Sequence, residues 1–421
     1  MKHYFLGMAQ EYADGEWLRH LLTIGRKRDL KNLENYLSKR YQGEAMLCKN
    51  GRSSLALALK ANFEPGDAVI VNGFTCYAVY EAVKEAGLTP IFADISREDL
   101  NFDIEKLNAI LENSRVRGII VQNTLGNPTD IGAIENLAEK YDLKIVEDLA
   151  HCAGVHYSDG REVGTVGVAT ALSFGKEKSI DTVSGGAVVF RGEAFIESEG
   201  VRSAAAREVA REPRGGLSKE SSKERTSSFF RDDDRLATLV DGRERRAPRI
   251  DKSSPLKAPK PSDHLRAKFY PMFGALTRTL TYVGIGGAVM RCLVKIHWVE
   301  RSADNRLDTS RRCSKFEAKL ALKQLKRLRK SGEMPIREFC FVHDRDKCLK
   351  ELKRKGYYFG GFWYEKPVSP ERYYKNVHFD EMNCQNACYV AEHIINLPIY
   401  YTRRDLTPAL KIIKKYLEEE A

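Results

Sequence analysis

A lysine at position 178 is the residue of this sequence best suited to covalent chemistry. It ends the stretch Ser-Phe-Gly-Lys-Glu-Lys at 173–178, and Ser-Gly-Gly at 184–186 precedes the apolar run Ala-Val-Val at 187–189. A lysine amine held between apolar, strand-like segments is partly desolvated, which lowers the pKa of such an amine and makes it a nucleophile toward aldehydes. Lys176 is the alternative, because residues two apart on a strand face the same way.

An acid and a helix start complete a chemical set with this lysine. Asp148 follows the apolar stretch 143–147, and the ligand crevices of parallel sheets lie at the carboxyl ends of strands. Gly51 and Arg52 stand where a helix is expected to begin, and the first amides of a helix bind a phosphate dianion well. A lysine, a carboxylate and a phosphate site together describe a site for pyridoxal 5'-phosphate (PLP), whose pyridinium nitrogen pairs with the acid.

The surrounding residues predict an α/β pattern that would bring these positions together. Short apolar strands alternate with segments of helical character, which is typical of βαβ units and a mainly parallel sheet. The strands are expected at 45–48, 68–71, 90–93, 118–121 and 143–147, and the helices at 51–61, 77–86, 103–112 and 130–140. The candidate residues then lie at one edge of the sheet, where the strands end.

Length and composition restrict the class of protein. The chain has 421 residues, of which 43% are hydrophobic and 30% charged, enough for a substantial core and more than one domain. No apolar run reaches the roughly 18–20 residues of a membrane span, and the start Met1–Met8 is too short for a signal peptide. Nine cysteines are scattered without the spacing of a zinc site. We therefore expect a soluble, cytoplasmic protein with free thiols and no metal.

Basic charge gathers in one unusual stretch. Residues 202–262 hold 16 Lys/Arg and 10 Asp/Glu, which accounts for more than half of the net charge of +11. Few large apolar side chains occur there, so burial cannot offset the entropy of ordering the segment. We predict a disordered basic insertion at 201–265 that follows a large domain at 1–200. A solvated spacer fits this composition better than an RNA-binding surface, which would interleave aromatic residues.

Apolar residues return after this stretch. Residues 269–299 are rich in them and are interrupted by basic residues. The segment 266–313 is expected to be a helical connector, formed either by core or dimer-contact helices or by a helix lying on an anionic, inner membrane face. Helices dominate a predicted small α/β domain at 314–421, in which the aromatic run 357–364 is a strand or an aromatic-lined loop.

The sequence resembles the DegT/StrS-type sugar aminotransferases, a branch of the fold-type-I PLP-dependent enzymes. The resemblance covers 43–190, including Gly66-Asp67, the stretch 87–94 and Gly126-Asn127-Pro128, and it resumes weakly at 314–325 and 396–398. It implies a large domain with a mainly parallel seven-stranded sheet and a small α/β C-terminal domain. It also implies PLP as cofactor and a homodimer whose active sites form at the subunit interface.

Four residues match the family's motifs. Lys178 matches its Schiff-base lysine, and the spacing from Ser173 favours Lys178 over Lys176. Asp148 matches the pyridinium partner, and His151 matches the Gln or His near the phenolic oxygen of the ring. Ser173 matches the serine that hydrogen-bonds the phosphate. A dehydratase branch of the family has histidine in place of this lysine, so the resemblance at Lys178 implies amino transfer.

Other positions depart from the family's pattern. Gly51 and Arg52 fall where the family has Gly-Thr, whose amides hold the phosphate, and Arg52 either adds a charge contact or points to solvent. Cys76 and Tyr77 lie where an aromatic ring stacks on the cofactor. The family's Asn-x-Arg stretch, which reaches the partner subunit's phosphate, aligns with Ser-Arg-Arg at 310–312 and so keeps only its arginine.

The resemblance implies a function in the biosynthesis of sugars or polysaccharides. The expected reaction transfers an amino group, with glutamate as donor, to a keto-sugar linked to a nucleotide. The alternative is a catalytically idle PLP fold that acts as a regulatory or membrane-associated scaffold, which the insertion, the basic excess and the missing Asn motivate. Nucleic-acid binding is the weakest of the three hypotheses.

Overall fold

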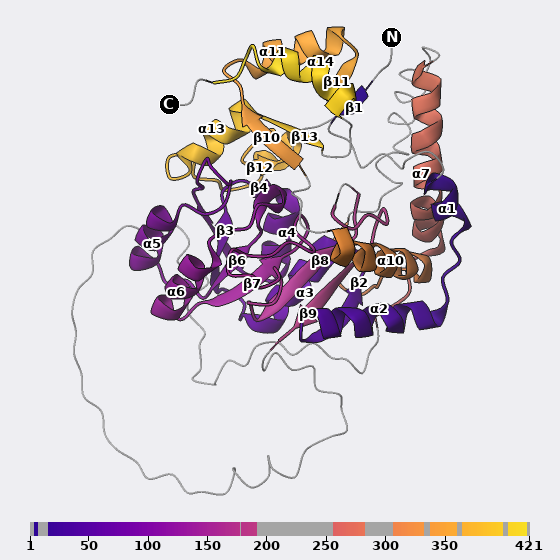
Figure 1. Ribbon diagram of the computed structural model, residues 1–421. Coiled ribbons are helices and arrows are strands. Elements are labelled where there is room, and N and C mark those ends of the chain that lie inside the picture. Colours follow the sequence, from indigo (N-terminus) through magenta and orange to yellow (C-terminus); the bar gives the residue numbers. More distant parts are fainter. Residues whose placement is uncertain are drawn as a thin grey trace, which may run out of the picture.

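A seven-stranded sheet forms the centre of the molecule in the computed structural model (Figure 1). The strand order is β2 (Glu44–Cys48), β9 (Gly186–Phe190), β8 (Ala169–Ser173), β7 (Lys144–Asp148), β6 (Gly118–Val121), β3 (Ala68–Asn72) and β5 (Thr89–Ala93). Only β9 runs antiparallel to its neighbours in this sheet, and the other neighbouring pairs are parallel. The predicted mainly parallel seven-stranded sheet is confirmed.

The described residues cover most of the chain. They are 4–6, 16–176, 178–191, 256–282, 306–331, 337–359, 364–398 and 403–418. The predicted basic insertion at 201–265 therefore lies outside the described residues except for its last ten positions.

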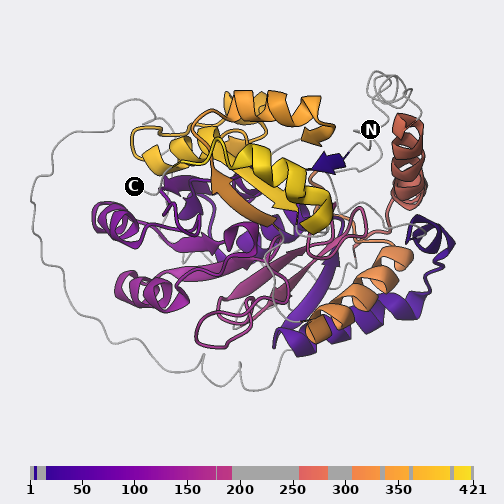
Figure 2. The same ribbon diagram turned by 45° about the horizontal axis from the view of Figure 1, so that its top comes forward.

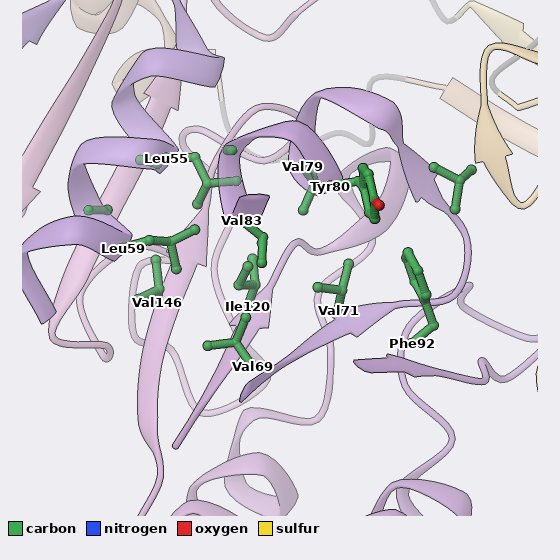
Figure 3. Packing of buried hydrophobic residues seen from close by; sticks show 14 of the residues in the cluster. Leu55, Leu59, Val69, Val71, Val79, Tyr80, Val83, Phe92, Ile120 and Val146 are labelled. Carbon is green, nitrogen blue, oxygen red and sulfur yellow. The ribbon is translucent and has the colours of Figure 1, made fainter. Parts of the chain in front are cut away.

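Side chains alternate along the strands and build one core on each face of the sheet. Val69 and Val71 of β3 pack under α3 (Gly51–Asn62) and α4 (Tyr77–Glu85), as Figure 3 shows. Ile70 belongs to the core of the opposite face. The helices of that face are α2 (Lys27–Arg40), α5 (Ile104–Asn113), α6 (Ile131–Tyr141) and α10 (Lys315–Ser331). Successive residues of β3 thus belong to alternate cores, as the period of two of a strand covered on both faces requires.

The C-terminal residues form a second, smaller unit over one end of this sheet (Figures 1 and 2). Its strands are β10 (Arg337–Phe341), β11 (Tyr357–Phe359), β12 (Val368–Ser369) and β13 (Ile394–Pro398), together with β1 (Tyr4–Leu6) from the N-terminus. Its helices are α11 (Arg345–Arg354), α12 (Glu371–Tyr374), α13 (Gln385–His393) and α14 (Arg403–Ile413). β12 pairs with β4 (Thr75–Cys76), so a strand contact joins the two units beside the candidate site.

The boundary between these units falls after α10 rather than before it. α10 was placed by sequence in the small domain that begins at 314, but its Ala318, Ala321 and Leu325 belong to the core under the large sheet. α10 belongs to the large unit because its apolar face packs against α2. The short 3₁₀ helix η1 (Thr124–Gly126) follows β6 and reaches the edge where β10 lies.

Two helices stand beside each other at the side of the molecule (Figures 1 and 2). α1 (Glu16–Leu22) contacts α7 (Pro261–Tyr282), and the buried His20 lies with its Nε2 3.3 Å from the carbonyl oxygen of Ala267. α7 thus begins inside the stretch predicted as insertion and includes the first part of the predicted connector 266–313. Among the described residues, no helix has both the length and the apolar character needed to cross a bilayer.

Candidate active site

The carboxyl edge of the parallel strands gathers the residues singled out by sequence. Asp148 is the last residue of β7 and Ser173 is the last of β8, and these two strands are paired in parallel. His151 follows Asp148 by three residues, and Lys178 follows Ser173 by five. Parallel strands end at the same edge of a sheet, which is why residues 30 positions apart in sequence meet here.

Asp148 is a partly buried carboxyl at this edge. Its Oδ1 accepts a hydrogen bond from the Ala150 amide at 2.9 Å. Burial raises the pKa of the Asp148 carboxyl, while the Ala150 amide and the charge of Lys178 act to lower it. A cation brought close to this carboxylate would favour its ionised form, as a pyridinium nitrogen would.

His151 lies fully inside the site and is held through both ring nitrogens. The amide of Leu125 donates to Nδ1 at 3.2 Å, so a neutral ring carries its proton on Nε2. Burial lowers the pKa of His151 well below its usual value, and the charges of Lys178 and Arg337 act in the same direction. Leu125 has a φ of 56°, in the left-handed region, and this strained backbone directs its amide to the ring.

The two candidate lysines point to different partners. Lys178 Nζ lies 3.1 Å from His151 Nε2. Lys176 Nζ donates to the Tyr270 hydroxyl at 3.1 Å and lies over the Tyr270 ring, 4.3 Å from its centre. The described residues between β8 and β9 are bends and turns rather than a strand, so the expectation that both side chains face the same way is wrong. The structure brings Lys178 to His151 and directs Lys176 to α7.

The segment that carries Lys178 is fastened to α10. Gln324 accepts from the Asp181 amide and donates to the Asp181 carbonyl, both at 2.7 Å. Ser184 donates to Glu317 at 2.5 Å. Between them lies Val183, fully buried with a φ of 73°, a conformation that a β-branched residue rarely adopts. No sequence motif pointed to these α10 contacts.

Gly51 and Ser173 form a close contact that suits a phosphate group. A Cβ at Gly51 would lie 2.4 Å from the Ser173 Cβ and 2.6 Å from its Oγ, so only glycine fits. α3 begins at Gly51, where Asn50 caps the helix by accepting from the Ser53 amide at 2.9 Å. The first-turn amides of this helix and the Ser173 hydroxyl are the donors that bind a phosphate monoester.

Arg52 and Tyr77 have other partners than the two alternatives considered from sequence. The Arg52 guanidinium forms an ion pair with Glu81 of α4, so it is neither directed to a phosphate nor simply solvated. The Tyr77 ring stacks on Tyr373 of α12, with ring centres 4.6 Å apart. Cys76 caps α4, because its Sγ accepts from the Ala78 amide at 3.4 Å. These contacts follow from α4 lying against both α3 and the small unit.

Residues of the small unit reach the site, and sequence reasoning did not identify them. Tyr364 is buried, with its hydroxyl 3.3 Å from His151 Nε2 and its ring edge-on to Phe74. Arg337 opens β10, is 3% exposed, and donates to Asn396 of β13 at 3.2 Å. Tyr364 ends the aromatic run at 357–364, which was the only signal for it. A lone arginine in the sequence carried none.

The segment 310–312, which aligns with the family's Asn-x-Arg, pairs with Lys257 just before α7, and the residues that precede it lie against the start of α3. The amide of Asp308 donates to the Ser53 hydroxyl at 3.0 Å, and Asn50 donates to the Arg306 carbonyl at 3.0 Å. Arg312 lines a cavity of about 440 Å³ whose titratable lining residues, other than cysteine, are all basic side chains. These are Arg312, His264, Lys268 and Lys315. Among the described residues, no group of three or more potential metal ligands occurs.

Known proteins share this sequence pattern and fold. Residues 7–213 match the DegT/DnrJ/EryC1/StrS aminotransferase family. A UDP-N-acetyl-3-dehydro-alpha-D-glucosamine 3-aminotransferase of Acidithiobacillus ferrooxidans is 34% identical over 151 residues, 36% of this chain and 40% of its own length. GDP-perosamine synthase of Escherichia coli O157:H7 is 32% identical over 185 residues, 44% of this chain and 50% of its own length. The chain thus spans half or less of these relatives.

A solved structure extends the likeness to the whole chain. Spr1654 of Streptococcus pneumoniae, solved in a PLP form, superposes with a TM-score of 0.61 over 99% of this chain and 100% of its own. At 16% identity this match shows a shared fold. The predicted fold-type-I class is confirmed by it, including a small unit that follows the large one.

Proposed function

We propose that this chain, which through residues 7–213 is a member of the DegT/DnrJ/EryC1/StrS aminotransferase family, is a PLP-dependent aminotransferase acting on a sugar. The observation that carries the proposal is the meeting of Lys178, His151 and Asp148 at the sheet edge where Gly51 touches Ser173. An amine, a carboxylate and a phosphate site at this spacing are the groups that the cofactor requires.

The residues at the edge fit PLP in their chemistry. The helix start at Gly51 and the Ser173 hydroxyl would hold its phosphate, Asp148 its ring nitrogen, His151 its ring oxygen, and Lys178 its aldehyde carbon. When bound, PLP supplies an electron sink for negative charge at the α-carbon of the amino donor. The protein's part is to bind, to orient and to move protons.

Lys178 is the proposed acid and base of the reaction. Its Nζ would take the proton from the donor's α-carbon and deliver it to C4′, the carbon that carries the cofactor's aldehyde. His151 Nε2, 3.1 Å from this amine, keeps the amine pointed into the site. The neutral His151 ring favours this arrangement, because an imidazolium would repel a charged amine at that distance.

A covalent label would test the assignment of the lysine. The protein is loaded with PLP, reduced with borohydride and digested, and the peptide that carries the cofactor's mass is identified. Loss of the label in Lys178→Met with retention in Lys176→Met is expected, because Lys176 is engaged with Tyr270. Retention in Lys178→Met with loss in Lys176→Met would contradict the assignment.

The substrate class is proposed from the relatives' names together with the site. A UDP-linked and a GDP-linked sugar appear in the names of the two sequence relatives, which supports a keto-sugar linked to a nucleotide as amino acceptor. Glutamate is the proposed donor. The two half-reactions can be tested separately. Glutamate alone should convert bound PLP to its amine form. A keto-sugar nucleotide that is a substrate should then convert the amine form back to PLP.

The same half-reaction decides against or for the scaffold alternative. An idle fold would retain PLP without converting it in the presence of glutamate or of any other amino acid. The basic insertion and the missing Asn motivated that alternative, and neither bears on the Lys178–His151 contact. If no amino acid yields the amine form while the borohydride label is present, the aminotransferase proposal fails.

A homodimer is the proposed assembly. Apolar side chains are exposed on α1 and α7, two helices that contact each other, with Leu18 44%, Leu22 66% and Leu265 52% exposed. A second copy covering them would remove this apolar surface from water. Light scattering of Leu22→Glu against the unchanged protein tests this, with a shift to monomer expected.

Sedimentation with vesicles of anionic lipid tests the alternative, peripheral contact at the inner membrane face.

A cytoplasmic location is proposed on the thiols. All eight cysteines among the described residues are free, and Cys48, Cys152, Cys313, Cys348 and Cys384 are buried. Free thiols in this number are typical of a reducing compartment. Cell fractionation would test the location.

A further inference from the structure

The segment 178–184, which starts with Lys178, contains neither helix nor strand. On the side of the sheet edge it is held by Ser179, whose hydroxyl donates to the His151 carbonyl at 2.9 Å. Its other side contacts α10. A segment without a regular backbone ladder takes its shape from contacts of this kind, so the side chains of α10 that reach it help to decide where Lys178 stands.

Gln324 of α10 pairs with both backbone polar groups of one residue in this segment. Its Oε1 accepts from the Asp181 amide and its Nε2 donates to the Asp181 carbonyl, both at 2.7 Å. The amide side chain carries the donor and the acceptor that this pair needs. The Asp181 carboxylate accepts in turn from the Val183 amide at 2.9 Å, so the residue that Gln324 holds also shapes the turn at Val183.

Glu317 of α10 holds the segment at a second point. Its Oε1 accepts from the Ser184 hydroxyl at 2.5 Å, and its Oε2 accepts from the Ser314 amide at 2.6 Å. The Glu317 side chain is buried, and burial raises the pKa of its carboxyl, while the bonds from Ser184 and Ser314 act to lower that pKa. Because each carboxylate oxygen accepts its own hydrogen bond, this side chain is a fixed point of attachment.

The spacing of these two attachments sets the direction of the segment. Glu317 and Gln324 stand two helical turns apart on one face of α10, a separation of about 10 Å. Their partners Ser184 and Asp181 are three residues apart, a stretch that spans at most about 11 Å. When both contacts are made, the segment therefore runs along α10 in the opposite direction to the helix, and Lys178 stands three residues before the first attachment.

We propose that Gln324 is a positioning residue for Lys178, which it keeps at the sheet edge by fixing the backbone of Asp181, with Glu317 as the second attachment at Ser184. The proposal rests on the proposed function only for its effect on amino transfer, since the contacts themselves belong to the protein without cofactor. A misplacement of about 1 Å at a reacting group can lower a rate about 100-fold. A helix that does not contact the reacting atoms can thus set how fast they react.

Chemical labelling of the protein without cofactor tests the positioning directly. Limiting acetic anhydride modifies a fraction of each lysine, and mass spectrometry gives the rate at each position. Gln324→Met keeps the length of the side chain and removes both hydrogen-bonding groups. Lys178, half-buried in the folded protein, should then react at least about threefold faster, because its segment opens more often. An unchanged rate at Lys178 in the folded variant would overturn the proposal.

Lys144 and Lys323 supply the controls. Lys144 donates to the Asn62 carbonyl at 2.9 Å at the other end of its strand, so its own rate of acetylation should be the same in all variants. Lys323 is exposed on α10 beside Gln324, and Lys323→Met is the matched substitution. It should leave the rate at Lys178 unchanged. A faster reaction at Lys178 in Lys323→Met as well would overturn the proposal, since any change of α10 would then have the same effect.

Ser184→Ala is the second variant, because it removes the other attachment without altering α10. It should raise the rate at Lys178 in the same direction as Gln324→Met. If Gln324→Met does not fold, an unchanged rate at Lys178 in Ser184→Ala overturns the proposal.

Kinetics of amino transfer separate positioning from a merely structural role. Gln324→Met should lower kcat by at least about tenfold and change the KM for glutamate by less than about twofold, because the amine is displaced while the donor's contacts remain. An unchanged kcat together with faster labelling would overturn the effect on catalysis. If the unchanged protein transfers no amino group while the labelling behaves as expected, the proposed function fails and the positioning of Lys178 by Gln324 stands.

Discussion

Two regions contribute to the site in different ways. The sheet edge, formed by Gly51, Asp148, His151, Ser173 and Lys178, supplies groups that carry charge or form bonds. The C-terminal cover, formed by Arg337, Tyr364, Tyr373 and Asn396, supplies groups that pack and orient. The strand ends of the edge are positioned by backbone register, whereas the cover depends on how two units meet. In the proposed function the edge therefore carries the chemistry, and the cover helps to align it.

The sharpest difference within the edge should appear at the two lysines. Lys178→Met is expected to lower the rate of amino transfer by at least about 10³-fold, because the proposed proton carrier is lost. Lys176→Met, which removes a contact to Tyr270, should lower it by less than about tenfold. Steady-state kinetics on both variants checks this. Similar losses of rate in the two variants would contradict the assignment of proton transfer to Lys178.

Gly51→Ala adds a methyl group to the site, and it is expected to have the next largest effect on stability and on PLP binding. The new Cβ would overlap Ser173, so unfolding should require about 1–3 kcal/mol less and PLP should bind more weakly. Gly132→Ala is the control, since the nearest atom to its Cβ is 3.5 Å away in helix α6 and the change should stabilise by about 0.5–1 kcal/mol. Urea unfolding and PLP titration measure both variants.

Asp148→Asn should separate stability from function. Because burial raises the pKa of Asp148, the folded protein binds this proton more tightly than the unfolded chain. The cofactor-free protein therefore loses stability as pH rises from the ordinary value of 3.8 through the raised one, and the loss remains at neutral pH. The Asn variant should then be more stable than the unchanged protein at pH 7, with the gain vanishing below about pH 4, and should bind PLP less tightly.

Urea midpoints of the cofactor-free proteins across this pH range are the measurement. A variant that is less stable at pH 7 would mean that the carboxylate has a partner that compensates its burial. Asp148 would then be a group that stabilises the fold, as the residues of the cover do, and would no longer distinguish the edge from the cover.

The smallest effect is expected in the cover. Tyr373→Ala removes the ring stacked on Tyr77 and should lower the free energy of unfolding by about 0.5–1.5 kcal/mol, with amino transfer changed by less than about threefold. Tyr373→Phe keeps the stack and should behave as the unchanged protein. A large kinetic effect of Tyr373→Ala, seen in kcat and not in the unfolding curve, would show that the cover takes part in catalysis through Tyr77.

The sheet edge could be predicted from sequence and the cover could not. Strand ends follow from short apolar runs, and the parallel pairing of β7 and β8 then brings Asp148, which pairs with Ala171, and Ser173 to the same edge of the sheet. Tyr364 and Arg337 reach the same site only through the packing of the small unit, which no local pattern of residues specifies. α10 shows the same limit, because its amphipathic pattern predicts a helix but not the unit on which it packs.

Ion pairing was the other source of error. Arg52 follows Gly51 and was expected either at the phosphate or in solvent, yet Glu81 of α4 takes its guanidinium. An arginine at a helix start has several turns of neighbouring helix within reach, and its choice among them depends on side chains distant in sequence. The backbone amide of Arg52, in contrast, is fixed by the helix and lies in the first turn of α3, where a helix start was predicted.

Val183 links the lysine segment to helices remote from it. A left-handed conformation is unfavourable by about 1–2 kcal/mol for a residue with a side chain, and Ala267 of α7 and Phe316 of α10 pack over this valine. Those helices therefore hold the backbone five residues beyond Lys178 in a shape it would leave if uncovered. A substitution on α7 or α10 can in this way shift the proposed nucleophile, Lys178, without contacting it, so residues far from the site can influence its geometry.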